Sequence, residues 1–237
     1  MPTTNINFDN KLGKGLTTSI TFSPSSPLSF LNTLSTEFNG TTNLVTFPTV
    51  TLPNEFTVSF WFKPTNVGVD SYVIGRDTTA SPSDYIWLRE TNQIRVRISF
   101  FTYTFLETNS NLVNTGSWNH LFVTRDSSNN LTLFLNNQVF SSSQVASGDY
   151  RLEKIGNIDS SFYNGNVDEL GIWNSDQSAN RNTIYGTGSP RDLNPLSPLL
   201  WYRMGEGDIY PTITDNAGTN DATMVSMSAG NFVGDVP

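Results

Sequence analysis

Apolar and polar residues alternate along much of the chain. Ile94, Val96 and Ile98 are separated by Arg95 and Arg97, so one face of this segment is apolar and the other is polar. A period of two residues is typical of a β-strand that buries one face. The pattern predicts a half-buried strand at this point.

The same alternation recurs at Leu131, Leu133 and Leu135, between pairs of asparagines that favour turns. Further short apolar runs, separated by Gly, Pro, Asn, Asp or Ser, occupy residues 56–62, 71–75, 84–88, 118–124 and 199–204. Many short strands at this spacing predict an all-β protein, either an antiparallel sandwich or a barrel. One segment, 175–185, has a pattern suited to a short helix, with Ser175 as its N-cap.

Residues 1–34 lie outside the regular strand pattern. They are rich in Thr, Ser, Asn and Pro, yet they contain scattered apolar residues such as Phe8, Ile20 and Phe22. Two interpretations stay open: an edge strand of the chain's own sandwich, or an arm that docks on a neighbouring subunit or particle.

Charge and composition exclude several classes of function. The 237 residues carry a net charge of −8, with no basic surface expected for nucleic acid. There is no cysteine, which removes disulfides and thiol chemistry. No run approaches the ~20 apolar residues of a membrane span, and the start MPTTNINFDN has no basic and apolar leader, so we expect no signal peptide.

Several motifs carry a family resemblance. Residues 37–48, 56–64, 118–137, 162–174 and 182–188 read EFNGTTNLVTFP, FTVSFWFKP, WNHLFVTRDSSNNLTLFLNN, FYNGNVDELGIWN and NTIYGTG. In this order they resemble laminin-G-like and pentraxin-like domains of the concanavalin A-like lectin/glucanase superfamily. The ending at 199–224 resembles the terminal segment of such domains in marine bacteriophage and related microbial proteins.

The resemblance implies a two-sheet antiparallel jelly-roll sandwich, with a concave face and loops that bind glycans or calcium in the family. It divides the chain into an N-terminal arm or docking segment at 1–34 and a laminin-G-like jelly-roll domain at 35–237.

Adjacent carboxylates in the segment VDEL raise the question of catalysis. Successive residues of a strand point to opposite faces, so Asp168 and Glu169 are predicted to lie apart and not to form an acid/base pair. Glucanases of the superfamily carry three carboxylates spaced two apart, whereas GEGD supplies Glu206 and Asp208 alone. We expect both acids of VDEL to be scaffold, His120 to be a structural histidine, and the protein not to be an enzyme.

Calcium is the candidate cofactor. By resemblance to pentraxins, Asp84 and Asp159 would supply carboxylates and Asn157 an amide oxygen. The family's acidic cluster is reduced here to Asn157-Ile158-Asp159, so ordinary loop residues are the alternative reading.

Exposed aromatic side chains are candidates for stacking against sugar rings. The sequence suggests Tyr72, Tyr85, Trp87, Phe101 and Tyr103 for this role. Core packing, or contact with another subunit, is the alternative for each.

Three function classes remain. The first is a non-enzymatic virion-surface module of a bacteriophage: a capsid-decorating, appendage or fibre protein made in the host cytoplasm. Its partners would be other virion proteins or copies of itself, with host-surface glycans as ligands. The second is a free carbohydrate-binding lectin that uses calcium, and the third is a glycan hydrolase. Neither nucleic acid nor a membrane is an expected partner.

Overall fold

A computed structural model describes residues 30–66, 70–76, 84–98, 104–146 and 148–237. The chain divides into residues 1–31 and 32–237, and the fold described below is that of the second unit. The predicted arm falls almost wholly outside the described residues. Asn32, Thr33 and Leu34, which the sequence assigned to the arm, bond instead to side chains of the second unit.

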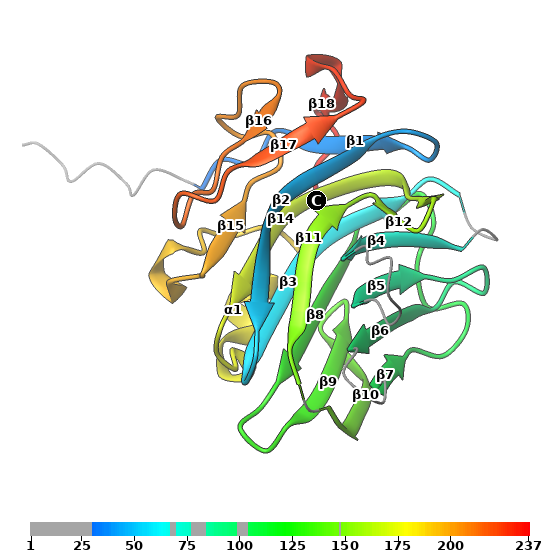
Figure 1. Ribbon diagram of the computed structural model, residues 1–237, viewed down its shortest axis with the longest axis vertical. Helices are drawn as coiled ribbons and strands as arrows, with labels where there is room; N and C mark the ends of the chain where they lie inside the picture. The colour runs from blue at the N-terminus through cyan, green and yellow to red at the C-terminus, as the bar shows by residue number, and fades with distance from the viewer. Residues whose placement is uncertain (1–29, 67–69, 77–83, 99–103, 147) are drawn as a thin grey trace, which may run out of the picture. The chain divides into compact units, whose positions relative to one another are not determined.

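The first sheet contains eight strands, in the order β10-β9-β8-β3-β14-β1-β18, with β15 paired to β14 at one end (Figure 1). Its strands are β1 (Ser35–Asn39), β3 (Phe56–Pro64), β8 (Asn119–Arg125), β9 (Asn130–Leu135), β10 (Gln138–Val145), β14 (Asn164–Trp173), β15 (Leu200–Tyr202) and β18 (Phe232–Val233).

The second sheet also contains eight strands, in the order β16-β17-β2-β11-β4-β5-β6-β7. They are β2 (Leu44–Leu52), β4 (Ser71–Gly75), β5 (Tyr85–Leu88), β6 (Ile94–Ile98), β7 (Thr104–Glu107), β11 (Tyr150–Ile155), β16 (Thr212–Ile213) and β17 (Ala222–Val225). Between β11 and β14, a small hairpin joins β12 (Asn157–Ile158) and β13 (Ser161–Phe162).

The two sheets enclose one apolar core. Ile94, Val96 and Ile98 of β6 face it, and so do Leu131, Leu133 and Leu135 of β9. The predicted alternation, the core residues and the all-β jelly-roll fold are therefore confirmed.

The C-terminal segment belongs to both sheets. The strand predicted at 199–204 is β15, which pairs with β14 of the first sheet. Further on, β17 pairs with β2 of the second sheet, and β18 returns to pair with β1 of the first. Residues after 199 are thus part of the sandwich itself.

Helical structure is sparse in the described part of the chain. It comprises α1 (Arg181–Tyr185) and the 3₁₀ turns η1 (Ser178–Asn180), η2 (Asn194–Leu196) and η3 (Ala229–Asn231). The predicted helix at 175–185 exists only in its second half, and Asn180 occupies the N-cap, so the prediction for Ser175 is wrong. The hydroxyl of Thr57 accepts from the backbone N–H of Gln177, which holds this stretch against β3 in a non-helical conformation. No helix among the described residues is long and apolar enough to cross a membrane.

Candidate functional site

Two rows of side chains cross strands β4 to β7 on the side of the second sheet that faces away from the core. In the first row Tyr72, Trp87, Arg95 and Glu107 are cross-strand neighbours in turn. The second row runs from Tyr85 through Arg97 to Phe105. Side chains opposite each other in a sheet are close enough to touch. We call these seven residues the aromatic–arginine face.

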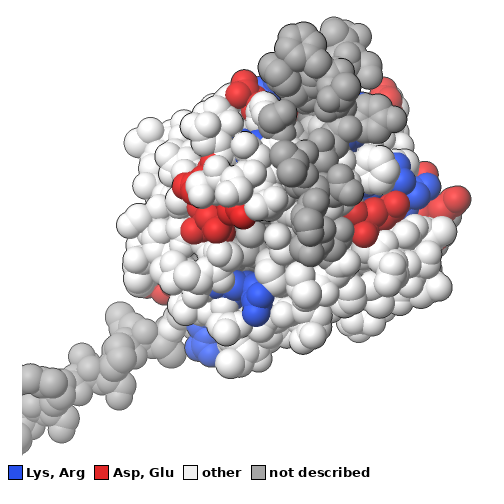
Figure 2. All heavy atoms as spheres, turned by 90° about the horizontal axis from the view of Figure 1, so that it is seen from below, with Lys and Arg blue, Asp and Glu red and all other residues white. Residues whose placement is uncertain are grey.

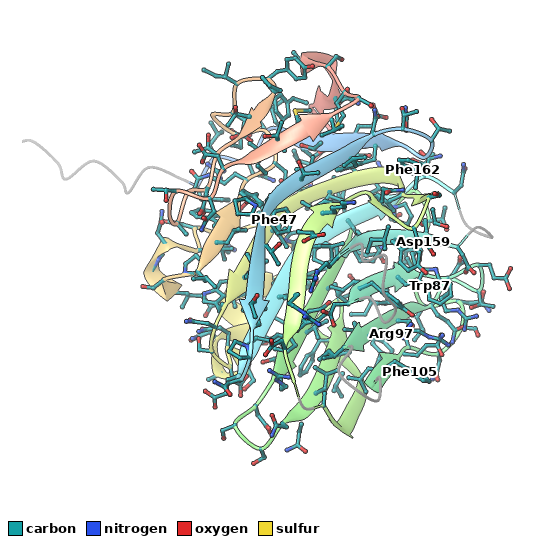
Figure 3. All side chains as sticks on the ribbon, viewed as in Figure 1. Phe47, Trp87, Arg97, Phe105, Asp159 and Phe162 are labelled. Atoms are coloured by element: carbon teal, nitrogen blue, oxygen red, sulfur yellow. The ribbon has the colours of Figure 1, made fainter. Side chains whose placement is uncertain are left out.

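Aromatic rings form one end of this face. The ring of Tyr72 stacks on Trp87 with centroids 5.5 Å apart, and Tyr85 meets both rings edge-on at 5.0 and 5.8 Å. Tyr72 and Trp87 are half-buried, whereas Phe105 at the other end is 40% exposed. Figure 3 shows Trp87, Arg97 and Phe105 following one another across β5, β6 and β7.

Arginines link the rings of this face. The Arg95 guanidinium lies 5.3 Å from the Trp87 centroid and 4.7 Å from that of Phe105. Arg89, just beyond β5, covers Trp87 at 5.0 Å. Both arginines donate to Glu107, at 2.9 Å from Arg89 and at 3.1 and 3.2 Å from Arg95. Because planar guanidinium groups stack on rings and bind carboxylates at the same time, they fix the orientation of the Trp87 ring.

The ionisation of this face follows from the same contacts. Although partial burial opposes it, the hydrogen bonds from Arg95 and Arg89 lower the pKa of Glu107, so the carboxylate is ionised at neutral pH. Burial, with the neighbouring Tyr85 and Asp159, raises the pKa of Tyr72, which keeps its hydroxyl neutral. The face therefore offers the neutral Tyr72 hydroxyl together with arginines already partly balanced by an acid.

The structure brings together three of the five predicted aromatic residues. Tyr72, Tyr85 and Trp87 are in mutual contact, whereas Phe101 and Tyr103 lie outside the described residues. The sequence did not single out Arg95 or Phe105 for this face. The period-two pattern gives the side of its own strand to which each residue points. The pairing register of β5, β6 and β7, which sets these residues beside Trp87, is a tertiary property.

The predicted calcium residues lie in different surroundings. Asp84 is buried and accepts from the Arg151 backbone N–H at 3.1 Å and from its guanidinium at 3.2 Å. Asn157 is buried in β12, and Asp159 is exposed in the turn that follows. No group of three or more His, Asp or Glu side chains that could hold a metal occurs in the described part of the chain. Calcium binding stays a prediction.

Both acids of VDEL lie on the outer side of the first sheet. The prediction that Asp168 and Glu169 point to opposite faces of the strand is therefore wrong. Val167 and Leu170 both face the core, so the two residues between them face away from it together. The pairing of β14 with β3 is interrupted between Asp168 and Gly171, and Glu169 has φ 48°. This β-bulge inserts one residue and places both carboxylates on the same side of the sheet.

Both acids are nevertheless buried. Asp168 is 0% exposed and accepts from the Asn32 amide at 2.9 Å. Glu169 is 4% exposed and accepts from the Trp201 indole at 2.7 Å and from Arg203 at 3.1 Å. Burial, with the adjacent Glu169, raises the pKa of Asp168 well above its usual range. Burial also raises the pKa of Glu169 to about 7.

A cavity of about 10 Å³ adjoins Glu169, Ser59, Trp61 and His120. This volume holds about one water molecule, so a sugar ring cannot reach the carboxylate. His120 Nε2 lies 2.8 Å from the Ser59 hydroxyl, and burial lowers the pKa of His120 to about 3. The histidine is therefore neutral and packed, as expected for a structural residue.

The remaining acidic turns serve the backbone. Glu206 accepts from the Leu34 N–H at 2.7 Å, and Asp208 from the N–H groups of Gly205 and Thr214 at 2.8 Å. Asp215 accepts from the N–H groups of Trp201 and Ala217, each at 3.0 Å. These bonds account for the carboxylates as loop-closing groups.

Comparison with known proteins adds a family and a set of folds. Residues 39–181 match the family model described as the concanavalin A-like lectin/glucanases superfamily. No curated protein matches the sequence significantly.

Among solved structures, a candidate carbohydrate-binding protein from Bacteroides ovatus superposes with a TM-score of 0.64 at 14% identity, covering 84% of this chain. This chain spans 59% of that protein's length. A heptameric pentraxin from Limulus polyphemus gives 0.50 at 10% identity, covering 65% of this chain and 82% of its own. The NanB sialidase from Streptococcus pneumoniae gives 0.50 at 15% identity, covering 66% of this chain and 27% of its own.

Proposed function

The chain belongs to the concanavalin A-like lectin/glucanases superfamily, and we propose that it is a non-enzymatic domain that binds glycans on the aromatic–arginine face. The observation that carries this proposal is the contact of Tyr72, Tyr85 and Trp87 in one ring cluster, with Arg95 laid across its edge. The description of the Bacteroides ovatus relative as a candidate carbohydrate-binding protein supports the same direction.

The chemistry of the face suits a sugar. A pyranose has an apolar side, formed by its C–H groups, that stacks on an aromatic ring, while its hydroxyls need hydrogen-bond partners. Phe105, which is 40% exposed, and the accessible part of Trp87 supply aromatic surface. The half-buried Tyr72 supplies a hydroxyl that both donates and accepts. Since Glu107 pairs with Arg89 and Arg95, these arginines are held in fixed positions before a ligand arrives.

Charge is sparse on one side of the molecule. Figure 2 shows one side of the molecule on which Lys and Arg form small groups apart from one another, among atoms that are mostly uncharged. Among the described residues on this side there is no continuous basic patch of the kind a polyanion would need. This surface is compatible with a ligand recognised by hydroxyls and ring faces.

A glycan array followed by calorimetry tests the proposal. An aromatic anchor in a binding site is commonly worth ~2 kcal/mol or more, so Trp87→Ala is expected to weaken the best glycan at least about tenfold. Tyr185→Ala is the matched control, because Tyr185 is a half-buried aromatic residue that stacks on Trp61 of the first sheet. Equal losses in both variants would contradict the assignment of the face.

The absence of catalysis is proposed on the burial of the acids. Asp168 and Glu169 have no access for a sugar, and Glu206 closes a loop. A reducing-sugar assay with β-glucans is expected to give no activity for the natural protein or for Glu169→Gln. Hydrolysis that disappears in Glu169→Gln would overturn this reading.

A virion-surface role is a second candidate, favoured by the resemblance of residues 199–224 to bacteriophage domains. In this reading the jelly roll faces outward and residues 1–31 dock on a particle. A chain lacking residues 1–31 is then expected to stay folded and to bind glycans, but to lose particle association. If the shortened chain still sediments with particles, residues 1–31 are not needed for particle association and the docking role is wrong.

A further inference from the structure

A second cleft lies where β1 and β3 of the first sheet end and where β14 of the same sheet and β4 of the second sheet begin. Its volume is about 220 Å³, and its lining residues come from segments far apart in the sequence. They are residues 39–41 in the turn after β1, Asn66 after β3, Ser71 of β4, Phe162 of β13, and Asn164 of β14.

Backbone hydrogen bonds hold the walls of this cleft together. The Gly40 N–H donates to the Tyr163 carbonyl at 3.1 Å, and the Thr65 N–H donates to the Asn164 carbonyl at 3.0 Å. The Asn39 side chain accepts from the three N–H groups of residues 41–43, which fixes the turn. A cleft formed in advance loses little conformational entropy when it binds a ligand.

Gly40 allows one wall to approach closely. Its φ is +73°, and an added Cβ would lie 2.8 Å from the Cβ of Asn164. A side chain here would be strained and would collide with that residue. The turn that contains Gly40 therefore packs directly against Asn164, and the two form adjoining walls of the cleft.

The polar groups of the lining are uncharged, and several of them are not engaged by other described residues. Within the described residues, the amides of Asn66 and Asn164 and the hydroxyl of Ser71 form no hydrogen bond, and no acidic or basic side chain lines the cleft. Amides and hydroxyls both donate and accept, as sugar hydroxyls do. The Phe162 ring adds one apolar surface to this polar set.

We propose that this cleft is a binding site for a single uncharged sugar ring. Its volume is below the ~300–1,000 Å³ of pockets for drug-sized ligands, which limits the occupant to one ring. The lack of charged lining groups favours a neutral hexose or its N-acetyl derivative over a uronate or a phosphate, whose buried charge would have no partner.

The cleft is distinct from the aromatic–arginine face. In Figure 3, Phe162 lies beyond Asp159 when followed from Trp87, and no lining residue belongs to the two cross-strand rows. The proposal therefore does not depend on glycan binding at Trp87.

Amide NMR titration with glucose, galactose, N-acetylglucosamine and glucuronate tests this site. At millimolar concentrations a neutral sugar is expected to shift the resonances of residues 39–41, Asn66 and Asn164 in the natural protein. Asn66→Ala should weaken that sugar about tenfold or more. Asn54→Ala is the matched control, since Asn54 is an exposed turn residue before β3, at the opposite end of that strand.

The outcomes separate the two sites. Shifts at the cleft that persist in Trp87→Ala and disappear in Asn66→Ala support the proposal. Asn66→Ala is expected to fold, because the Asn66 side chain is exposed and forms no hydrogen bond within the described residues. Shifts confined to β4–β7, no shifts with any neutral sugar, or tighter binding of glucuronate would each overturn it.

Discussion

The outer faces of the two sheets carry similar residue types, but these residues are largely buried on the first sheet and partly exposed on the second. On the first sheet, Glu169 contacts Trp201 and Arg203, and on the second, Glu107 contacts Arg95 beside Trp87. The C-terminal segment supplies Trp201 and Arg203 beside Glu169, Asn32 contacts Asp168, and both acids are buried. The second face keeps Phe105 exposed and Trp87 half-buried. Residue type alone does not identify a binding site. Whether other segments cover the residue determines whether a ligand can reach it.

The largest expected effect concerns the core that both faces share. Leu133→Ala removes a fully buried side chain that packs between the sheets, and such changes typically cost about 2–5 kcal/mol. The melting temperature should fall markedly, as measured by calorimetry. A negligible change would mean that β9 does not face the core.

Next, the same substitution on each face compares the two ion pairs. Arg203→Met removes the cation beside the buried Glu169. Because the pKa of Glu169 is already raised to about 7, the carboxyl then takes up a proton, and we expect a loss of about 1–3 kcal/mol in unfolding free energy for the lost charged hydrogen bond. Arg95→Met leaves Glu107 with Arg89 on an accessible face, where pairs are worth about 0–1 kcal/mol. Urea unfolding measures both, and equal losses would remove the distinction between the faces.

The two faces should also respond to pH with opposite signs. The pKa of Asp168 is raised in the folded protein, and that of Glu169 is raised to about 7. The native state therefore holds more protons than the unfolded chain, and this contribution to stability falls as pH rises from about 4 through 7. Asp168→Asn should flatten that decline in thermal melts.

Glu107 is the control for this pH dependence. Its pKa is lowered in the folded protein, so its contribution to stability is present above the unfolded pKa of about 4.3 and is lost as pH falls through the folded pKa. Glu107→Gln should lower stability by a constant amount above about pH 5 and should change the slope of the profile only on its acid side. A changed slope above pH 5 in Glu107→Gln, or an unchanged slope in Asp168→Asn, would contradict the burial argument.

Calcium is expected to have the smallest effect. A site that includes Asp84 and Asp159 would raise the melting temperature when calcium is added, by mass action on the native state. Because Asp84 already accepts from Arg151, we expect little change. A rise that Asp159→Asn abolishes would establish the site.

Sequence alone predicted the parts of this molecule that depend on local periodicity. The alternation of Ile94, Val96 and Ile98 was enough to place β6 and its buried face. It failed at Glu169, where a non-glycine residue adopts φ 48° in a bulge and turns Asp168 to the same side. Nothing in VDEL distinguishes a bulge from a regular strand, because the interruption is set by pairing with β3.

Only part of the candidate site could be predicted from the sequence. Tyr72, Tyr85 and Trp87 were identifiable as aromatic residues in the two strands predicted at 71–75 and 84–88, and they do meet. Their contact with Arg95 depends on the register of β5 with β6, and the cleft beside Asn66 and Asn164 depends on segments about 100 residues apart. Both are tertiary properties that a single sequence does not encode locally.

The most direct test of the account is a crystal structure of the protein with its best-binding oligosaccharide. We predict a sugar ring packed against the accessible part of Trp87, with hydroxyls bonded to groups of the aromatic–arginine face, while Asp168 and Glu169 stay covered. An oligosaccharide bound over the first sheet against Glu169, with the C-terminal segment displaced, would contradict the central claim.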